Sequence, residues 1–288
     1  MKTTVLLKVL IVLFLFSCST VPLTGRKQLN MIPGDQIMSM SFQQYSDFLK
    51  ENPPVTGTKD VQMVKAVGRN IESAVEKYLT DNKLSSLLNG YQWEFNLIND
   101  KAVNAWCMPG GKVVVYSGIL PVTQNETGLA VVMGHEIAHA IAEHGNERMS
   151  QELLRSAGSV GLEVALNDQP EQTKNLWMMA YGAGTEVAAI LPYSRLHESE
   201  ADHLGLIFMA MAGYNPEESV AFWQRMSAAS NGQKPPEFLS THPSDQTRIN
   251  NLNKWIPQAM KYYTGKKSPT YQRKGNSAKT IKVLGNPK

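Results

Sequence analysis

The spacing of apolar residues predicts a long amphipathic helix in the first third of the chain. Between Asp60 and Leu79, apolar side chains recur every three or four residues, at Val64, Val67, Ile71, Val75 and Tyr78. This period places them on one face of an α-helix. The pattern becomes helical again after Asn125, which is a good N-cap, and it stays mostly helical to Tyr262.

Two short segments have the pattern of β-strands. Trp93, Phe95 and Leu97 alternate with polar residues, which is typical of a half-buried strand. A second candidate, residues 113–116, follows a Pro-Gly-Gly turn. The pattern therefore predicts a mainly helical chain that carries a small sheet.

The N-terminus has the pattern of a leader segment. Lys2 and Lys8 precede or adjoin an eight-residue apolar run, Val9 to Phe16, which is too short to span a bilayer. The small residue before Cys18 resembles the cleavage site of bacterial lipoproteins, and an ordinary secretory signal is the alternative. We therefore predict a lipoprotein signal peptide over residues 1–17 and lipidation of Cys18. The expected location is the cell envelope, lipid-anchored and facing the periplasm, on the outer membrane.

Composition excludes several classes of function. The formal net charge is +3, but residues 265–288 contain only basic charges, so the remainder is slightly acidic. The folded part therefore has no basic surface for nucleic acid. Two cysteines, Cys18 and Cys107, exclude a disulfide scaffold and a multi-cysteine metal site. With Cys18 lipidated, Cys107 has no partner within the chain.

The motif His135-Glu136-Ile137-Ala138-His139 carries the strongest chemical signal. On a helix, His135 and His139 are four residues apart and share one face, so both imidazoles can bind one Zn²⁺. Glu136 projects beside them, where it would accept a proton from the attacking water. The alternative is a helix with two structural core histidines.

Two zinc ligands are insufficient, and the third distinguishes the metallopeptidase families. A third histidine six residues after His139 is excluded because Gly145 stands there and His144 is out of register. The strongest alternative is a later helix on which Glu198 and Asp202 share a face, the first as ligand and the second bonded to a ligand imidazole. Three neighbours are expected to be solvated or partly buried rather than ligands: His197, Glu200 and His203.

Four motifs in the same order resemble the M48 family of zinc metallopeptidases, in particular its lipid-anchored, Oma1-like bacterial branch. They are HEIAH, the segment Glu198 to Asp202, the stretch NAWCMPGGKVVVYSGIL from Asn104, and Ser240 to Ser244 with Arg248. The resemblance implies an α+β, mainly α-helical zincin-like domain with a small antiparallel sheet beside the HExxH helix. It implies one Zn²⁺ per chain. The implied boundaries are a lipid-anchored tether and N-terminal segment over 18–54, the metallopeptidase domain over 55–262, and a basic flexible tail over 263–288.

The resemblance also assigns roles to individual residues. It implies His135, His139 and Glu198 as metal ligands, Glu136 as the base, and Asp202 behind a ligand. His242 and Arg248 would donate hydrogen bonds to the oxyanion. For His242 two alternatives stay open: a loop histidine that caps the following helix, or a ligand that closes the zinc site in a latent form.

The strand after the Gly-Gly turn is the expected binding site for an extended substrate. Gly111 permits close backbone approach, and an edge strand beside the active-site helix could pair with a substrate through main-chain hydrogen bonds. The residues expected to form this substrate-binding strand are Gly111, Val113, Val114, Val115 and Tyr116.

These observations predict a zinc-dependent endopeptidase (EC 3.4.24 type) acting on misfolded or misassembled cell-envelope proteins. Its partners would be extended or unfolded protein substrates and a membrane, reached through lipidated Cys18, with no nucleic acid. The alternative is a non-proteolytic periplasmic chaperone or assembly factor with a structural or latent zinc site, which a closed four-ligand site would favour.

Overall fold

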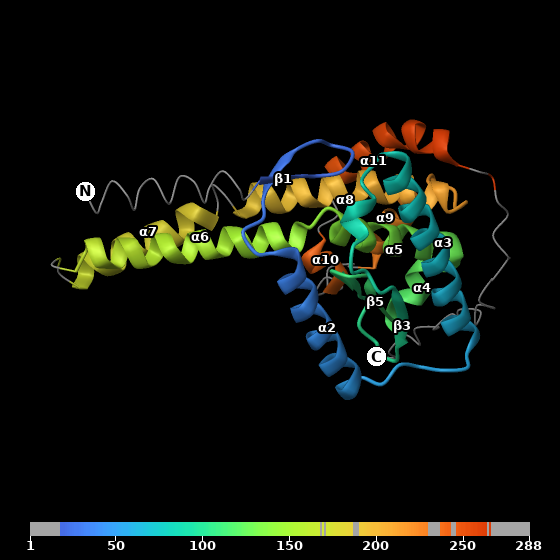
Figure 1. Ribbon diagram of the computed structural model, residues 1–288, viewed down its shortest axis with the longest axis horizontal. Helices are drawn as coiled ribbons and strands as arrows, with labels where there is room; N and C mark the ends of the chain where they lie inside the picture. Colours follow the sequence, from blue (N-terminus) through green and yellow to red (C-terminus); the bar gives the residue numbers. More distant parts are fainter. Residues whose placement is uncertain are drawn as a thin grey trace, which may run out of the picture.

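The computed structural model describes residues 18–263 and 265, except 168, 170, 187–189, 230–236 and 243–245. Figure 1 shows a mainly helical body from which one helical hairpin projects. The α-helices and strands of the first half are β1 (Cys18–Thr20), β2 (Lys27–Leu29), α2 (Gly34–Glu51), α3 (Lys59–Asp81), β3 (Glu94–Ile98), β4 (Ala105–Met108), β5 (Lys112–Tyr116) and α4 (Leu120–Thr123). Those of the second half are α5 (Glu126–Ile141), α6 (His144–Ala165), α7 (Glu171–Thr185), α8 (Leu191–Met211), α9 (Glu218–Ala228), α10 (Glu237–Thr241) and α11 (Gln246–Ala259). The 3₁₀ turns are η1 (Ser85–Leu88), η2 (Ser117–Ile119) and η4 (Met260–Tyr262).

Helix α5 forms the centre of the body. Its N-cap is Asn125, as predicted. The side-chain oxygen of Asn125 accepts hydrogen bonds from the backbone N–H groups of Thr127 and Gly128 at 2.9 and 3.0 Å. Every residue of α5 except Thr127 is buried. A helix that is apolar all round needs neighbours on all sides, and α3, α8, α9 and β4 supply them.

Two glycines bring α5 and α8 close together. A Cβ atom on Gly134 of α5 would lie 3.0 Å from the carbonyl oxygen of Gly205 of α8, and one on Gly205 would lie 3.0 Å from the carbonyl carbon of Gly134. The two backbones therefore touch at this crossing. The close approach matters because α5 and α8 carry the two halves of the site described below.

The sheet beside α5 has the order β3-β5-β4. Strands β4 and β5 are antiparallel, as predicted, whereas β3 pairs parallel to β5. Strand β5 is therefore the central strand, and the prediction that residues 113–116 form an edge is wrong. The edge beside α5 is β4, because the Gly110-Gly111 turn, with φ of 84° at both residues, folds the chain back so that β5 inserts between β4 and β3.

Strand β3 is buried on both faces rather than half-buried. Only Glu94 of its five residues is partly exposed. The second face is covered by α2, where the Asn96 side-chain amide donates a 2.8 Å hydrogen bond to the Tyr45 hydroxyl. The predicted alternation placed Asn96 in solvent, and α2 explains the difference.

The segment predicted as a tether, residues 18–54, contains β1, β2 and the 18-residue helix α2. Helix α2 packs on the body through Ile37, Ser41 and Tyr45, and the Ser41 hydroxyl donates to the carbonyl oxygen of Pro109 at 2.7 Å. Because one of these three buried residues is a serine, the period of apolar side chains on the buried face is weak. The sequence pattern therefore did not predict this helix.

Helices α6 and α7 form the projecting hairpin (Figure 1). It exposes large apolar side chains, namely Leu153, Val160, Val164, Leu176, Trp177 and Met179. Among the described helices, none combines the length and the hydropathy that crossing a bilayer requires.

Candidate metal centre

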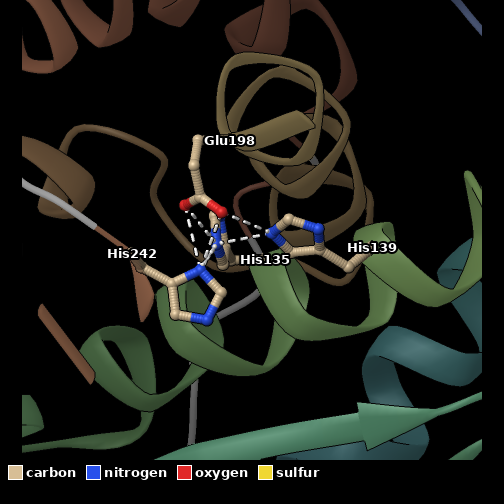
Figure 2. A group of neighbouring side chains, drawn as sticks. All are labelled: His135, His139, Glu198 and His242. Atoms are coloured by element: carbon tan, nitrogen blue, oxygen red, sulfur yellow. Dashed lines mark hydrogen bonds and ion pairs between the residues drawn. The ribbon is translucent and has the colours of Figure 1, made fainter. Parts of the chain in front are cut away.

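Three segments of the chain bring the predicted ligands and the predicted base together. Helix α5 presents His135, Glu136 and His139, and α8 presents Glu198 across the close crossing. His242 follows α10 directly, and its backbone N–H donates to the carbonyl oxygen of Phe238 at 2.8 Å. Figure 2 shows the three imidazoles and the Glu198 carboxylate converging on one point.

The four converging residues can hold a metal ion. One ligand atom from each of His135, His139, Glu198 and His242 lies within 4.8 Å of all the others. His135 Nε2 is 3.1 Å from His139 Nε2 and 3.1 Å from His242 Nδ1. Glu198 oxygens lie 3.4, 3.3 and 2.9 Å from the same three nitrogens, in the order His135, His139, His242. Tetrahedral ligands about 2.0–2.1 Å from one zinc ion lie about 3.3 Å apart, so the spacing fits that ion.

The chemistry of these donors also fits a cation. Burial would raise the pKa of Glu198, but the imidazoles of His139, His135 and His242 hold it far below its ordinary value. The carboxylate is therefore ionised in a nearly closed site. An anionic oxygen and three imidazole nitrogens are a donor set that zinc prefers.

Glu136 lies beside the four donors without joining them. Its side chain is buried, and Oε1 makes no hydrogen bond within the described part of the chain; the nearest ring nitrogen, Nε2 of His242, is 3.4 Å away. Burial raises the pKa of Glu136, while the nearby histidines His242 and His135 counteract this. A buried carboxyl oxygen without a hydrogen bond costs folding free energy, and such groups are typical of active sites.

Asp202 supports His135 from outside the four donors. Its Oδ1 lies 2.9 Å from Nδ1 of His135, on the ring edge opposite the converging nitrogen. The same oxygen accepts a 2.6 Å hydrogen bond from the Arg248 guanidinium. The hydrogen bond between Asp202 and His135 fixes the orientation of the imidazole and places its proton on Nδ1.

Arg248 lies behind the ligand carboxylate, on α11. Its guanidinium donates to Glu198 Oε2 at 3.2 Å and to Asp202, and it stacks on Trp223 with 3.4 Å to the ring centroid. It lines a cavity of about 290 Å³ on that side of Glu198. The resemblance implied an oxyanion donor; the structure places this guanidinium on the carboxylates of α8 instead.

A cleft of about 220 Å³ opens on the other side of the donors. Ala105, Trp106 and Cys107 of β4 form one wall, and Glu136, His139 and His242 form another. The predicted substrate strand, β5, does not line this cleft. Its place is taken by β4, the edge strand.

The neighbours predicted not to be ligands lie outside the four donors. His203 donates a 3.0 Å hydrogen bond from Nε2 to the side-chain oxygen of Gln258 and stacks on Trp255. His197 and Glu200 are buried in a separate cluster together with His144, which contacts His139. The spacing of His144 predicts no role in zinc binding, because this residue is out of register for a third ligand. Its contact with the outer nitrogen of His139 requires a bend after α5, where Glu143 adopts φ of 55°.

Comparison with known proteins decides the family. Residues 66–256 match the model of Peptidase family M48. The chain belongs to peptidase family M48. Mitochondrial metalloendopeptidase OMA1 of Saccharomyces cerevisiae is 36% identical over 200 residues, which cover 67% of this chain and 54% of that protein. Human mitochondrial metalloendopeptidase OMA1 is 31% identical over 262 residues, 88% of this chain and 48% of that one.

A bacterial M48 relative also matches. The beta-barrel assembly-enhancing protease of Yersinia pestis is 31% identical over 165 residues, covering 54% of this chain and 33% of that protein. The M48 chain described here spans about half the length of the yeast and human relatives, and about a third of the bacterial one.

The predicted location is wrong. Relatives from yeast, cattle, human and plant are named mitochondrial, which overturns the lipid-anchored, periplasm-facing place on an outer membrane. Two lysines and eight apolar residues form a pattern too short to specify one compartment. The predicted signal peptide, residues 1–17, lies outside the described residues, and so does most of the predicted tail; Cys18 is described only as the first residue of β1, paired with Leu29.

Proposed function

We propose that this M48 protein is a zinc-dependent endopeptidase, with one Zn²⁺ held by His135, His139 and Glu198. The observation that carries the proposal is the spacing of these three ligand atoms beside a buried Glu136 whose Oε1 lacks a hydrogen bond. Two relatives, a mitochondrial metalloendopeptidase and a beta-barrel assembly-enhancing protease, support it by their names. When bound, zinc supplies a Lewis acid that polarises the substrate carbonyl and increases the acidity of water.

The residues of the chain perform the remaining steps. Glu136 accepts a proton from the attacking water at Oε1 and delivers it to the leaving amine. Asp202 and Arg248 hold His135 and Glu198 in place through the 2.9, 2.6 and 3.2 Å contacts described above. Strand β4 is the edge of the sheet among the described strands and lines the cleft, so an extended substrate can add to it by main-chain hydrogen bonds. Such pairing requires an unfolded segment, which supports misfolded or misassembled proteins as substrates.

His242 closes the site at rest in this proposal. Its Nδ1 lies 2.9 Å from Glu198 and 3.1 Å from His135, as one of the four donor atoms that could hold the ion. If the imidazole of His242 bound the ion as a fourth ligand, it would take the position that water or substrate needs. The closed arrangement is also what the non-proteolytic alternative, a chaperone with a structural site, requires. A structural site has no use for the buried Glu136 oxygen, so we favour a latent peptidase.

The proposed function is tested by mapping cleavage products of unfolded casein after incubation with the zinc-loaded full-length chain. We expect internal cuts that a chelator stops and added zinc restores. A chain that suppresses aggregation of casein but produces no internal cuts, with His242 present or replaced, would support the chaperone alternative.

Replacing His242 separates the latent role from the catalytic role. His242→Ala opens the fourth position, so we expect the initial rate of casein cleavage to rise. Arg248→Ala leaves Glu198 and Asp202 without their guanidinium, and we expect the rate to fall by about 10–100-fold. The measurement is kcat and KM on one unfolded substrate. Equal losses of kcat in both variants at constant KM would instead show that His242 contacts the transition state.

Replacing Asp202 tests the support of His135. Asp202→Ala removes the acceptor for Nδ1 of His135 and one carboxylate partner of Arg248. We expect zinc affinity to weaken by about 10–100-fold while the ion still binds, because the ligands remain. Competition with a chromophoric chelator measures this, and an unchanged affinity would show that the aspartate does not orient His135.

A further inference from the structure

A second cluster of buried polar side chains lies at the outer nitrogen of His139. We call it the Arg26 cluster; its members are Arg26, His144, Glu147, His197 and Glu200. The two histidines and two glutamates are at most 3% exposed. They come from α6 and α8, whereas Arg26 comes from the loop between β1 and β2. Nothing in the chemistry proposed above uses this cluster.

The hydrogen bonds of His144 orient His139. Nδ1 of His144 is 2.9 Å from Nδ1 of His139, and Nε2 of His144 is 3.2 Å from Oε2 of Glu200. A carboxylate only accepts hydrogen bonds, so His144 donates from Nε2 and, as a neutral imidazole, accepts at Nδ1. His139 must then donate from Nδ1. Its Nε2 is left with a lone pair directed at the other ligand atoms, as metal binding requires.

Arg26 holds the carboxylate at the end of this chain. Its Nε and Nη2 donate to the two oxygens of Glu200 at 3.0 and 2.9 Å, and Nη1 and Nη2 donate to the two oxygens of Glu147 at 2.8 and 2.7 Å. Thr24 adds a 2.7 Å hydrogen bond from its hydroxyl to Glu200. Two buried carboxylates repel one another unless a cation lies between them, and the planar guanidinium satisfies both at once.

The fold of the N-terminal segment fixes Arg26. The loop closes through a 2.9 Å hydrogen bond from the Val21 N–H to the carbonyl oxygen of Arg26. After β2, the Met31 N–H donates to the Ser150 hydroxyl of α6 at 2.8 Å. The hairpin is therefore attached to the helix that carries His144 and Glu147.

We propose that Arg26 is a positioning residue for the metal centre, which acts through Glu200 and His144 to hold His139 with Nε2 directed at the ion. The inference rests on the zinc site of the proposed function. It gives the N-terminal hairpin, 109 residues before the first histidine of the HExxH motif, a part in metal binding.

The test measures zinc affinity of the full-length chain by chelator competition. Arg26→Gln removes the charge and the planar guanidinium that bonds both glutamates, and we expect zinc affinity to fall by about 10–100-fold. Arg26→Lys keeps a positive charge but not the guanidinium, so its zinc affinity should fall by a smaller factor. The matched control is Arg225→Gln, because Arg225 also pairs with a partly buried glutamate, Glu218, but contacts no metal ligand among the described residues. The zinc affinity of this variant should stay within about twofold of that of the parent, because only residues that hold the ligands affect metal binding.

A second readout separates positioning from general stability. Ring ¹⁵N NMR of the zinc-free chain reports the tautomer of His139, which we expect to carry its proton on Nδ1 in the parent and to be mixed in Arg26→Gln. If Arg26→Gln does not fold, Thr24→Val removes one bond to Glu200 and should lower zinc affinity in the same direction by a smaller factor. Unchanged affinity and tautomer in the folded variant, or an equal loss in Arg225→Gln, would overturn the proposal. If Arg26→Gln lost zinc affinity but the parent chain had no peptidase activity, the proposed function would be overturned and the role of Arg26 in metal binding would stand.

Discussion

Glu136→Gln is expected to retain zinc and to lose nearly all peptidase activity. Glu136 lies outside the four donors, so its replacement removes no ligand. Loss of a general base lowers kcat by about 10²–10⁴-fold. The measurement is kcat on unfolded casein, with zinc stoichiometry determined on the same sample. Glu126→Gln is the matched control, because Glu126 is also a buried glutamate of α5 but lies at its N-terminus.

The control variant should cleave at the parent rate. Near-normal activity in Glu136→Gln would contradict the assigned base, and the site would then fit the chaperone alternative better. Loss of zinc from Glu136→Gln would show that the carboxylate contributes to metal binding.

Glu198→Ala is expected to release zinc. It removes the anionic donor among three imidazoles and leaves Arg248 facing the vacated position. The loss of affinity should exceed the about 10–100-fold expected of a residue outside the ligand set. Chelator competition measures it, with Glu218→Ala as a control that removes a partly buried carboxylate paired to Arg225. If Glu198→Ala bound zinc as the parent does, another residue would have to be the third ligand.

The residues near the metal could be predicted because their positions follow from helical periodicity. Spacing of four residues puts His135 above His139 and Glu198 above Asp202, whatever the rest of the fold does. The Asn125 N-cap likewise sets the start of α5 locally. The meeting of α5 with α8 depends on tertiary structure, and Gly134 and Gly205 mark it. The approach of His242, which follows α10, depends on tertiary structure as well.

The remaining features depend on contacts between distant segments. Whether β5 is central or at an edge depends on where β3 pairs, and the continuous apolar run over residues 113–116 is the same in both cases. The role of Arg26 depends on a hairpin docking onto α6, with Glu147 and Glu200 lying 121 and 174 residues away in sequence. Helix α2 was missed because a serine stands in its buried face.

Zinc titration of the metal-free full-length chain is the decisive measurement for a zinc-dependent endopeptidase. Casein cleavage is followed while zinc is added in known amounts, in the parent and in His242→Ala. We expect the rate of cleavage to rise in proportion to zinc up to one ion per chain and then to stay level. Full binding of one zinc ion per chain without internal cleavage in either protein would contradict it.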